Sequence, residues 1–259
     1  MESTKNQCIG IYGFPKTGST WLRVIIGDLL QTQAQVPEWC PDIYWEADIR
    51  SSKPLFDADN HQLNFYKSHS KRLTVAYRGQ PLHTDKIIYI VRHPLDVFCS
   101  QLNYLLRVAP GDWSLPKKYL PEDVSAAKES GMITDFYSAF MLFGTLQPYF
   151  FDAGSWSENY LYWLSGKSDT PTCVIRYEDL YFNFEQEVNK ICNFLNLHFP
   201  SNLEEIRNLI DTKKTVDGGR FYWRKKPNNH IEFLTNDQIE NFYRYYSEII
   251  HLSGYDRKE

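Results

Sequence analysis

A glycine-bearing loop near the start of the chain has the residue types of an anion-binding site. The residues Gly13-Phe14-Pro15-Lys16-Thr17-Gly18-Ser19-Thr20 separate a short apolar run, Cys8–Gly13, from an amphipathic segment, Trp21–Leu30. Backbone N–H groups at the start of a helix bind anions with the help of the helix dipole, and Lys16 adds a cation beside them. We therefore expect the loop to cradle a phosphate or sulfate group.

Two common nucleotide-binding loops do not fit this segment. A Walker A loop, G-x-x-x-x-G-K-[ST], would need its lysine where the chain has Ser19, and Lys16 comes three residues earlier. The dinucleotide fingerprint G-x-G-x-x-G is absent as well. A simple strand-to-helix turn, in which a serine or threonine caps the helix, stays open as the structural alternative.

A second segment places phosphate-binding side chains directly after an apolar strand. Arg92 follows the run Lys86–Val91, and Ser100 comes eight residues later in a helix expected from Leu95 to about Leu106. The planar guanidinium of an arginine suits phosphate oxygens, and a hydroxyl near the start of a helix adds a directional donor. An ordinary surface ion pair is the alternative for Arg92.

Lys67 and His69 stand two residues apart at the end of another apolar run, Leu63–Lys67. Because side chains two apart on a strand share a face, we expect the ammonium and the imidazole to be neighbours. A neutral imidazole accepts a proton, and Lys67 should disfavour its charged form, so His69 is a candidate general base. A solvated or capping histidine is the alternative.

The apolar runs predict an α/β fold. Four of them are typical of buried strands: Cys8–Gly13, Leu63–Lys67, Lys86–Val91 and Thr172–Tyr177. Strands that alternate with helices predict a three-layer protein, in which helices flank a central, mostly parallel sheet and a P-loop-like phosphate loop follows the first strand. The length of 259 residues predicts a single domain over residues 1–259.

Charge and cysteine usage exclude several classes. The chain has 28 Lys and Arg against 32 Asp and Glu, a net charge of −4, so it lacks the basic surface of a general nucleic-acid binder. No stretch approaches the roughly 18 apolar residues of a membrane span, and we expect a soluble, cytoplasmic protein with no nucleic-acid or membrane partner. The five scattered cysteines contain no C-x-x-C pair, and no cluster has metal-ligand spacing, so neither disulfides nor a metal site is expected.

Two loop-like stretches are expected to flank a site. The first runs from Pro37 to Asn60. The second runs from Lys213 to Asn229, and its part Lys213–Lys226 holds six basic residues and one acidic residue, a local charge of +5 in an acidic chain. A local anion site and a solvated loop are both open interpretations of that charge.

Five segments together resemble the sulfotransferases that use 3′-phosphoadenosine 5′-phosphosulfate (PAPS). Pro15–Trp21 is similar to their P-K-[ST]-G-[ST]-T-W signature, and Arg92–Ser100 is similar to their R-[ND]-P-x-D-x-x-x-S segment. Tyr66–His69 resembles K-[ST]-H, Arg176–Leu180 resembles [RY]-Y-E-D-[LM], and Gly154–Trp156 resembles the G-S-[WY] helix opening. The family's C-terminal dimerisation pattern is not found, so no oligomeric state is inferred.

The resemblance implies a role for each matching residue. Lys16 would contact the oxygen that bridges phosphate and sulfate in PAPS, while Arg92 and Ser100 would grip the 3′-phosphate. His69 would deprotonate the acceptor hydroxyl, so the expected catalytic set is Lys16, Lys67 and His69. The residues expected to bind the donor are Lys16, Thr17, Gly18, Ser19, Thr20, Trp21, Arg92, Ser100, Tyr177, Arg224 and Lys225.

Some positions depart from the family pattern. Arg224 and Lys225 resemble the R-K-G loop that closes over the 3′-phosphate, but Lys226 replaces its glycine and the usual G-x-W is missing. Asn159 stands where a histidine often follows the G-S-[WY] opening. By resemblance, Trp21 and Tyr177 would border the adenine.

The expected reaction is sulfuryl transfer from PAPS to a hydroxyl of a small molecule, with 3′,5′-bisphosphoadenosine (PAP) as the second product and no metal. Phe14, Tyr104 and Phe143 are expected to wall the acceptor pocket, with core packing as the alternative. The short chain and its C-terminal loop resemble bacterial sulfotransferases that tailor natural products, so a natural product or alkaloid is the expected acceptor. A P-loop-type small-molecule kinase and a catalytically silent nucleotide-binding protein stay open.

Overall fold

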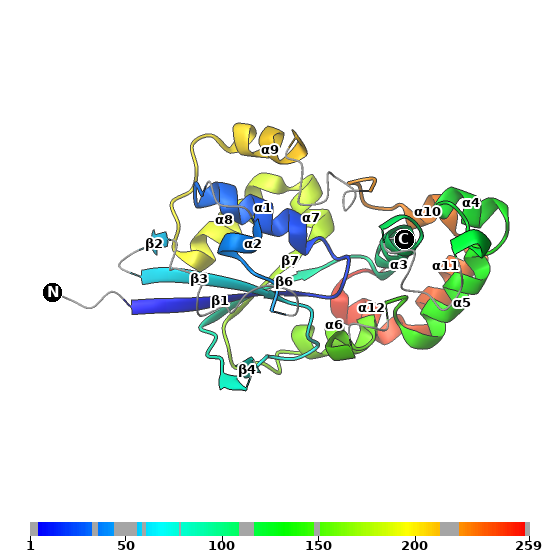
Figure 1. Cartoon of the computed structure of the whole chain (residues 1–259), viewed down its shortest axis with the longest axis horizontal. Coiled ribbons are helices and arrows are strands. Elements are labelled where there is room, and N and C mark those ends of the chain that lie inside the picture. The colour runs from blue at the N-terminus through cyan, green and yellow to red at the C-terminus, as the bar shows by residue number, and fades with distance from the viewer. Residues whose placement is uncertain are drawn as a thin grey trace.

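A five-stranded sheet runs through the middle of the protein (Figure 1). The computed structural model describes residues 5–32, 36–43, 56–58, 61–77, 79–108, 117–147, 151–212 and 223–256. The strand order is β2-β3-β1-β6-β7, and β2 alone pairs antiparallel. The strands are β1 (Lys5–Gly13), β2 (Phe56–Ala58), β3 (His61–Ser68), β6 (Lys86–Val91) and β7 (Thr172–Arg176). The expected mostly parallel sheet is therefore confirmed.

One face of the sheet packs against helices from both halves of the chain (Figure 1). Alternate strand residues such as Ile9, Ile11 and Ile88 point to this side and are fully buried, because side chains of a strand alternate between its faces. The helices are α1 (Ser19–Leu29), α2 (Val36–Trp39), α7 (Tyr177–Phe182), α8 (Phe184–Leu195) and α9 (Leu203–Thr212).

The opposite face carries an aromatic layer. Tyr12 and Tyr89 point to this side, and both pack on Trp163 of α6, with ring centroids 4.5 and 5.5 Å away. The remaining helices are α3 (Pro94–Asn103), α4 (Val124–Glu129), α5 (Ile133–Phe143), α6 (Trp156–Leu164), α10 (His230–Phe233), α11 (Asn236–Tyr245) and α12 (Ser247–Ser253). Helices thus cover both faces, which confirms the three-layer architecture.

The carboxyl ends of the parallel strands form one edge of the sheet. Strand β1 lies between β3 and β6, so the chain leaves β1 in one direction and later crosses to its other side. Such a switch point is where open α/β sheets bind ligands. The strands that end there, at Gly13, Ser68, Val91 and Arg176, are each followed by a residue or loop of the expected site.

The structure also differs from the expected elements. The helix after Pro94 ends at Asn103 and continues as one π-helical turn, Tyr104–Val108, which sequence periodicity does not predict. Short edge elements were missed because two or three residues carry too little pattern. They are β2, the hairpin of β4 (Ala76–Tyr77) and β5 (Gln80–Pro81), and the 3₁₀ turns Lys117–Tyr119 and Phe151–Ala153. No helix in the described ranges is long and apolar enough to cross a membrane.

Candidate functional site

The loop after β1 ends in a helix start that no side chain caps. The hydroxyl and the backbone N–H of Thr17 both donate to the Phe14 carbonyl, at 2.8 and 3.2 Å, which closes the loop on itself. Gly18 is the N-cap of α1 with φ of 105°, and no side-chain cap is present. The capping alternative is therefore wrong, and α1 begins without a side-chain cap, as helices that bind an anion at their start do.

Lys16 stands at the mouth of this loop in a strained conformation. Its φ of 74° lies in the left-handed region, which a non-glycine residue adopts at a cost that surrounding structure must offset. The Lys16 ammonium lies 4.5 Å from the centre of the Tyr104 ring on the π-helical turn. Of the aromatics expected at the acceptor, Tyr104 is thus beside Lys16, Phe14 is fully buried in the core, and Phe143 is 64% exposed at the end of α5.

Tyr177 joins the two halves of the expected donor site. A Cβ on Gly18 would lie 2.7 Å from the Tyr177 ring, so only glycine lets the loop pass that close. The centres of the Tyr177 and Trp21 rings lie 5.2 Å apart, and the Arg92 guanidinium lies 4.1 Å from the centre of the Tyr177 ring. The structure therefore brings Gly18, Trp21, Arg92 and Tyr177 together across three strand ends.

Arg92 is buried with unused hydrogen-bonding capacity. It is 7% exposed, and its Nε has no hydrogen-bond partner within the described part of the chain. Its Nη2 donates to the Lys226 carbonyl at 3.2 Å. Its Nη2 also lies 4.0 Å from Asp96 Oδ2, so the charge has a neighbour while the Nε–H has none among the described residues. A buried N–H without a partner is costly, and a phosphate oxygen would satisfy it. Ser100, on α3, is buried as well.

The carboxylate of Asp96, the aspartate of the Arg92–Ser100 segment, is buried one helical turn beyond Arg92, and the sequence alone assigned it no role. Asp96 accepts hydrogen bonds from the backbone N–H groups of Asn228 and His230, at 2.6 and 3.0 Å, and from His230 Nδ1 at 2.7 Å. Burial works to raise the pKa of Asp96, but the bond from His230 and the charge of Arg92 outweigh it and lower that pKa to about 2. Asp96 thereby ties the segment after Lys226 to α3.

Two histidines for which the sequence predicts no role, His93 and His230, lie beside Asp96. The imidazoles of His93 and His230 stack 4.4 Å apart and almost parallel. His93 Nδ1 accepts from the N–H of Leu95, so its Nε2–H donates to the Tyr243 hydroxyl at 2.8 Å. Burial and the neighbouring His230 lower the pKa of His93 to about 3. His93 is therefore neutral and structural, which only the three-dimensional packing reveals.

Glu178 does more than open a helix. It is the acidic residue of the Arg176–Leu180 segment that lies inside, where its two oxygens accept from the His93 N–H at 3.0 Å and the Tyr255 hydroxyl at 2.6 Å. Burial raises its pKa. Glu178 therefore holds the backbone next to Arg92, beyond its favourable position at the start of α7.

His69 is fixed in one tautomer against the end of β1. It is 6% exposed, and its Nδ1–H donates to the Gly13 carbonyl at 2.6 Å, which leaves the lone pair on Nε2. Burial, and next the charge of Lys67, lower the pKa of His69 to about 3, while Asp42 and the Gly13 bond oppose that shift. The expected effect of Lys67 is confirmed in direction, and the imidazole is neutral at physiological pH.

Helix α6 holds the backbone on both sides of the site. The Asn159 amide donates to the His69 carbonyl at 3.2 Å, and the Trp163 indole donates to the Ser70 carbonyl at 3.1 Å. The Tyr160 hydroxyl donates to the Arg92 carbonyl at 2.5 Å and accepts from the Arg92 N–H at 3.1 Å. The departure of Asn159 from the family pattern was the only sequence signal of this role.

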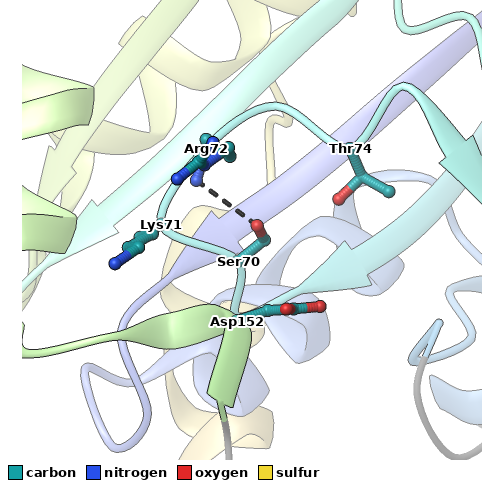
Figure 2. Close-up of a pocket in the computed structure, with 5 residues that line it drawn as sticks. All are labelled: Ser70, Lys71, Arg72, Thr74 and Asp152. Atoms are coloured by element: carbon teal, nitrogen blue, oxygen red, sulfur yellow. Dashed lines mark hydrogen bonds between the residues drawn. The ribbon is translucent and has the colours of Figure 1, made fainter.

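A small polar pocket follows directly after His69 in the chain (Figure 2). Its volume is about 330 Å³, and it is lined by Ser70, Lys71, Arg72, Thr74 and Asp152. The Ser70 hydroxyl accepts from the Arg72 N–H at 3.3 Å, and the Lys71 N–H donates to the Asp152 carbonyl at 2.7 Å. These contacts give the segment after His69 a defined shape.

The C-terminal basic stretch is only partly described. Residues 213–222 lie outside the described part of the chain. Arg224 forms an ion pair with Glu232, and its guanidinium lies 4.8 Å from the Phe233 ring. Lys225 has a left-handed φ of 48°, and the next carbonyl, of Lys226, is the one that Arg92 contacts. Donor binding by Arg224 and Lys225 stays a prediction.

The described residues contain no group of three or more His, Cys, Asp and Glu side chains arranged to hold a metal ion. The residues expected to bind an anion are a helix start, cationic side chains and aromatic rings at the carboxyl edge of the sheet. Such a fold and such residues at the strand ends are typical of α/β proteins that bind phosphate-bearing ligands.

Comparison with known proteins gives the family. Residues 7–254 match the family described as the sulfotransferase domain. Sulfotransferase 2A1 of Rattus norvegicus is 26% identical over 198 residues, which cover 74% of this chain and 60% of the relative. Cytosolic sulfotransferase 1 of Arabidopsis thaliana is 24% identical over 211 residues, covering 74% of this chain and 57% of the relative. The chain belongs to the sulfotransferase domain family, and it spans about 60% of the length of these curated relatives.

Solved structures share the fold. The crystal structure of a mouse sulfotransferase complexed with PAP aligns with a TM-score of 0.62 and 19% identity, over 94% of this chain and 84% of that one. Retinol dehydratase in complex with androsterone and the inactive cofactor PAP aligns with a TM-score of 0.63 and 11% identity, over 94% and 80% of the two chains. These similarities show that the architecture is shared.

Proposed function

We propose that the protein transfers a sulfuryl group from PAPS to a hydroxyl of a small molecule. The observation that carries this proposal is the pair of anion sites at one sheet edge, the uncapped start of α1 with Lys16 and the buried Arg92, which share Tyr177 between them. A nucleotide with phosphates on both its 5′ and 3′ positions matches two such sites on either side of an aromatic ring. Family membership and the PAP complexes of the related structures support the same donor.

The reaction needs a base, a leaving-group cation and an aligned acceptor. A neutral His69 would take the proton of the acceptor hydroxyl on Nε2 while Nδ1–H stays bonded to Gly13. The acceptor oxygen forms a bond to sulfur, the bond from sulfur to the bridging oxygen breaks, and its electrons remain on the departing 5′-phosphate. Lys16 and the α1 N–H groups would stabilise that negative charge, and PAP leaves as the second product.

Bound PAPS would also raise the pKa of His69. The Gly13 carbonyl that holds His69 immediately precedes the loop with Lys16, so a donor bound in that loop brings negative charge near the imidazole. Nearby negative charge raises the pKa of a histidine. The imidazole that is too weakly basic in the empty site would therefore become a better proton acceptor when PAPS is bound.

Ligand binding tests the donor assignment. Isothermal titration with PAP, with 5′-AMP and with ATP plus Mg²⁺ should rank PAP tightest, because only PAP fills both anion sites. Tighter binding of ATP with Mg²⁺ than of PAP would contradict the proposal in favour of a kinase.

Turnover tests the transferase assignment. Mass spectrometry of PAPS incubations with a panel of hydroxylated natural products, including alkaloids, should find an acceptor heavier by one sulfuryl group, together with PAP. His69→Asn is the matched control, since it should bind PAP like the parent while the product disappears. A parent protein that binds PAP and sulfates none of a broad panel would point instead to a silent binding protein.

A further inference from the structure

The segment just after α2 runs beside the end of β3 and brings a carboxylate to Lys67. The Lys67 N–H donates to the Pro41 carbonyl at 2.9 Å, and the Ile43 N–H donates to the Lys67 carbonyl at 3.1 Å. Arg23 of α1 reaches the Cys40 carbonyl at 2.9 Å and fixes the same segment from the other side. This is part of the loop-like stretch that was expected to flank a site.

The backbone pairing places Asp42 directly against Lys67. The Asp42 carboxylate and the Lys67 ammonium form a hydrogen-bonded ion pair, and the two residues are 5% and 7% exposed. His69 lies two residues beyond Lys67 and is equally buried. A buried charge without a partner is strongly destabilising, so the two charges depend on each other.

We propose that Asp42 is a positioning residue for sulfuryl transfer: its carboxylate holds the Lys67 ammonium at the end of β3 and offsets its charge beside His69. This inference rests on the proposed function only where it concerns the transfer step. The base must become an imidazolium as it accepts the proton, and an uncompensated ammonium two residues away opposes that change. Asp42 reduces this opposition while it keeps Lys67 in one geometry.

Three charged groups face His69 from different elements. Lys67 on its own strand and Arg23 from α1 disfavour the imidazolium, and Asp42 from the segment after α2 favours it. The groups of β1 and α6 that contact His69 are uncharged. They are the Gly13 carbonyl of β1 and the Asn159 amide of α6. Asp42 is thus the negative charge in a set that is otherwise cationic.

Histidine side-chain NMR on the nucleotide-free full chain tests the charge balance without any acceptor. Lys67→Met should raise the pH at which His69 titrates by about one pH unit or more, because the larger of the two cationic charges that disfavour the imidazolium is removed while Asp42 stays. Asp42→Asn should keep His69 neutral throughout the folded pH range. Lys67→Met that leaves His69 unmoved, or Asp42→Asn that raises its titration, would overturn the proposal.

Lys71→Met is the matched control. Lys71 is also two residues from His69, but on the other side, and its ion pair with Glu158 is partly exposed, with side chains 28% and 55% exposed. Solvent screens such a charge, so this variant should leave the titration of His69 in place. An equal shift from Lys71→Met would show that the Asp42–Lys67 pair has no special effect.

Stability and turnover complete the test. Each single variant removes one of the two paired charges, so the double variant Asp42→Asn/Lys67→Met should unfold at a higher temperature than Asp42→Asn alone. A lower unfolding temperature of the double variant would refute the coupling.

Once an acceptor has been identified, Asp42→Asn should lower kcat about tenfold with KM for PAPS within about threefold, and Asp42→Glu should recover part of the loss. Parental kcat in Asp42→Asn would refute the positioning role. A parent protein without turnover would refute the proposed function. The NMR and stability results would then decide whether the Asp42–Lys67 ion pair controls the charge of His69.

Discussion

The phosphate loop after β1 and the histidine segment after β3 lie at the same sheet edge but are built in opposite ways. The loop closes on itself, because Thr17 bonds to Phe14 only three residues away. His69 is held by Gly13, which is 56 residues away, and by Asn159, which is 90 residues away. The conformation of the loop is therefore set by contacts within the loop, whereas the position of His69 is set by contacts with distant parts of the chain.

This difference predicts how substitutions in each region should affect activity and folding. Substitution of Lys16, which is only half-buried, should remove chemistry and spare the fold, because the loop is closed by Thr17. The histidine segment should also be sensitive to substitutions in α6 and after α2, far from it in sequence.

The largest effect is expected from Lys16→Ala. Loss of leaving-group stabilisation of about 3 to 4 kcal/mol corresponds to a drop in kcat of about two to three decades. The melting temperature should stay near that of the parent, because the loop is closed by Thr17 and not by the lysine. Steady-state kinetics with PAPS measures this, and a parental kcat would remove Lys16 from the donor site.

His69→Asn should follow, with kcat lower by about a hundredfold or more, the usual worth of general-base catalysis. PAP affinity should stay within about threefold, since the proposed mechanism assigns the imidazole to the acceptor and not to the donor. Titration calorimetry and turnover on the same preparation separate the two effects. A variant that transfers at the parental rate would require another base.

Arg92→Ala should weaken PAP about ten- to a hundredfold and change 5′-AMP little, because a charge-assisted pair to the 3′-phosphate is lost. Ser100→Ala should show the same selectivity at smaller amplitude. Calorimetry with both nucleotides measures the ratio. Equal weakening of PAP and 5′-AMP would place Arg92 outside a 3′-phosphate site.

Helix α6 offers a sharper comparison, because neighbouring residues serve different segments. Asn159→Leu removes the bond to the His69 carbonyl and should lower kcat about tenfold with little change in PAP affinity. Tyr160→Phe removes both bonds to the Arg92 backbone and should weaken PAP about three- to tenfold. If Asn159→Leu weakened PAP binding and Tyr160→Phe lowered only kcat, the assignment of these two residues to different segments would be wrong.

The smallest effect concerns the pH dependence of stability. His69 and His93 have pKa values lowered to about 3, so an unfolded chain binds protons between about pH 6.5 and 3 that the folded chain does not. The free energy of unfolding should therefore fall as the pH drops through that window, by about 1.4 kcal/mol per pH unit for each histidine.

His93→Asn should flatten that slope in urea unfolding measured between pH 7 and 4. The exposed His83, whose side chain is 86% exposed, provides the control His83→Gln, which should leave the slope unchanged. An unchanged slope in His93→Asn would mean that its imidazole is charged in the folded protein.

The sequence by itself determined the parts whose physics is local. Apolar runs located β1, β3, β6 and β7 to within a few residues, since a buried strand needs only consecutive apolar side chains. Lys16, Arg92 and His69 were recognised because each lies within three residues of the end of such a run. In parallel strands these positions come to one edge, so the candidate site followed from the strand assignment.

Only the tertiary structure decided what surrounds those residues. The ion pair between Asp42 and Lys67, the bonds from α6 to the His69 and Arg92 backbones, and the Asp96–His230 contact join residues from 25 to 134 positions apart. Buried polar groups must find partners wherever the chain folds back, and no short motif encodes which partner that is. The lowered pKa of His69 follows from the same burial, and the short motif around this histidine gives no sign of it.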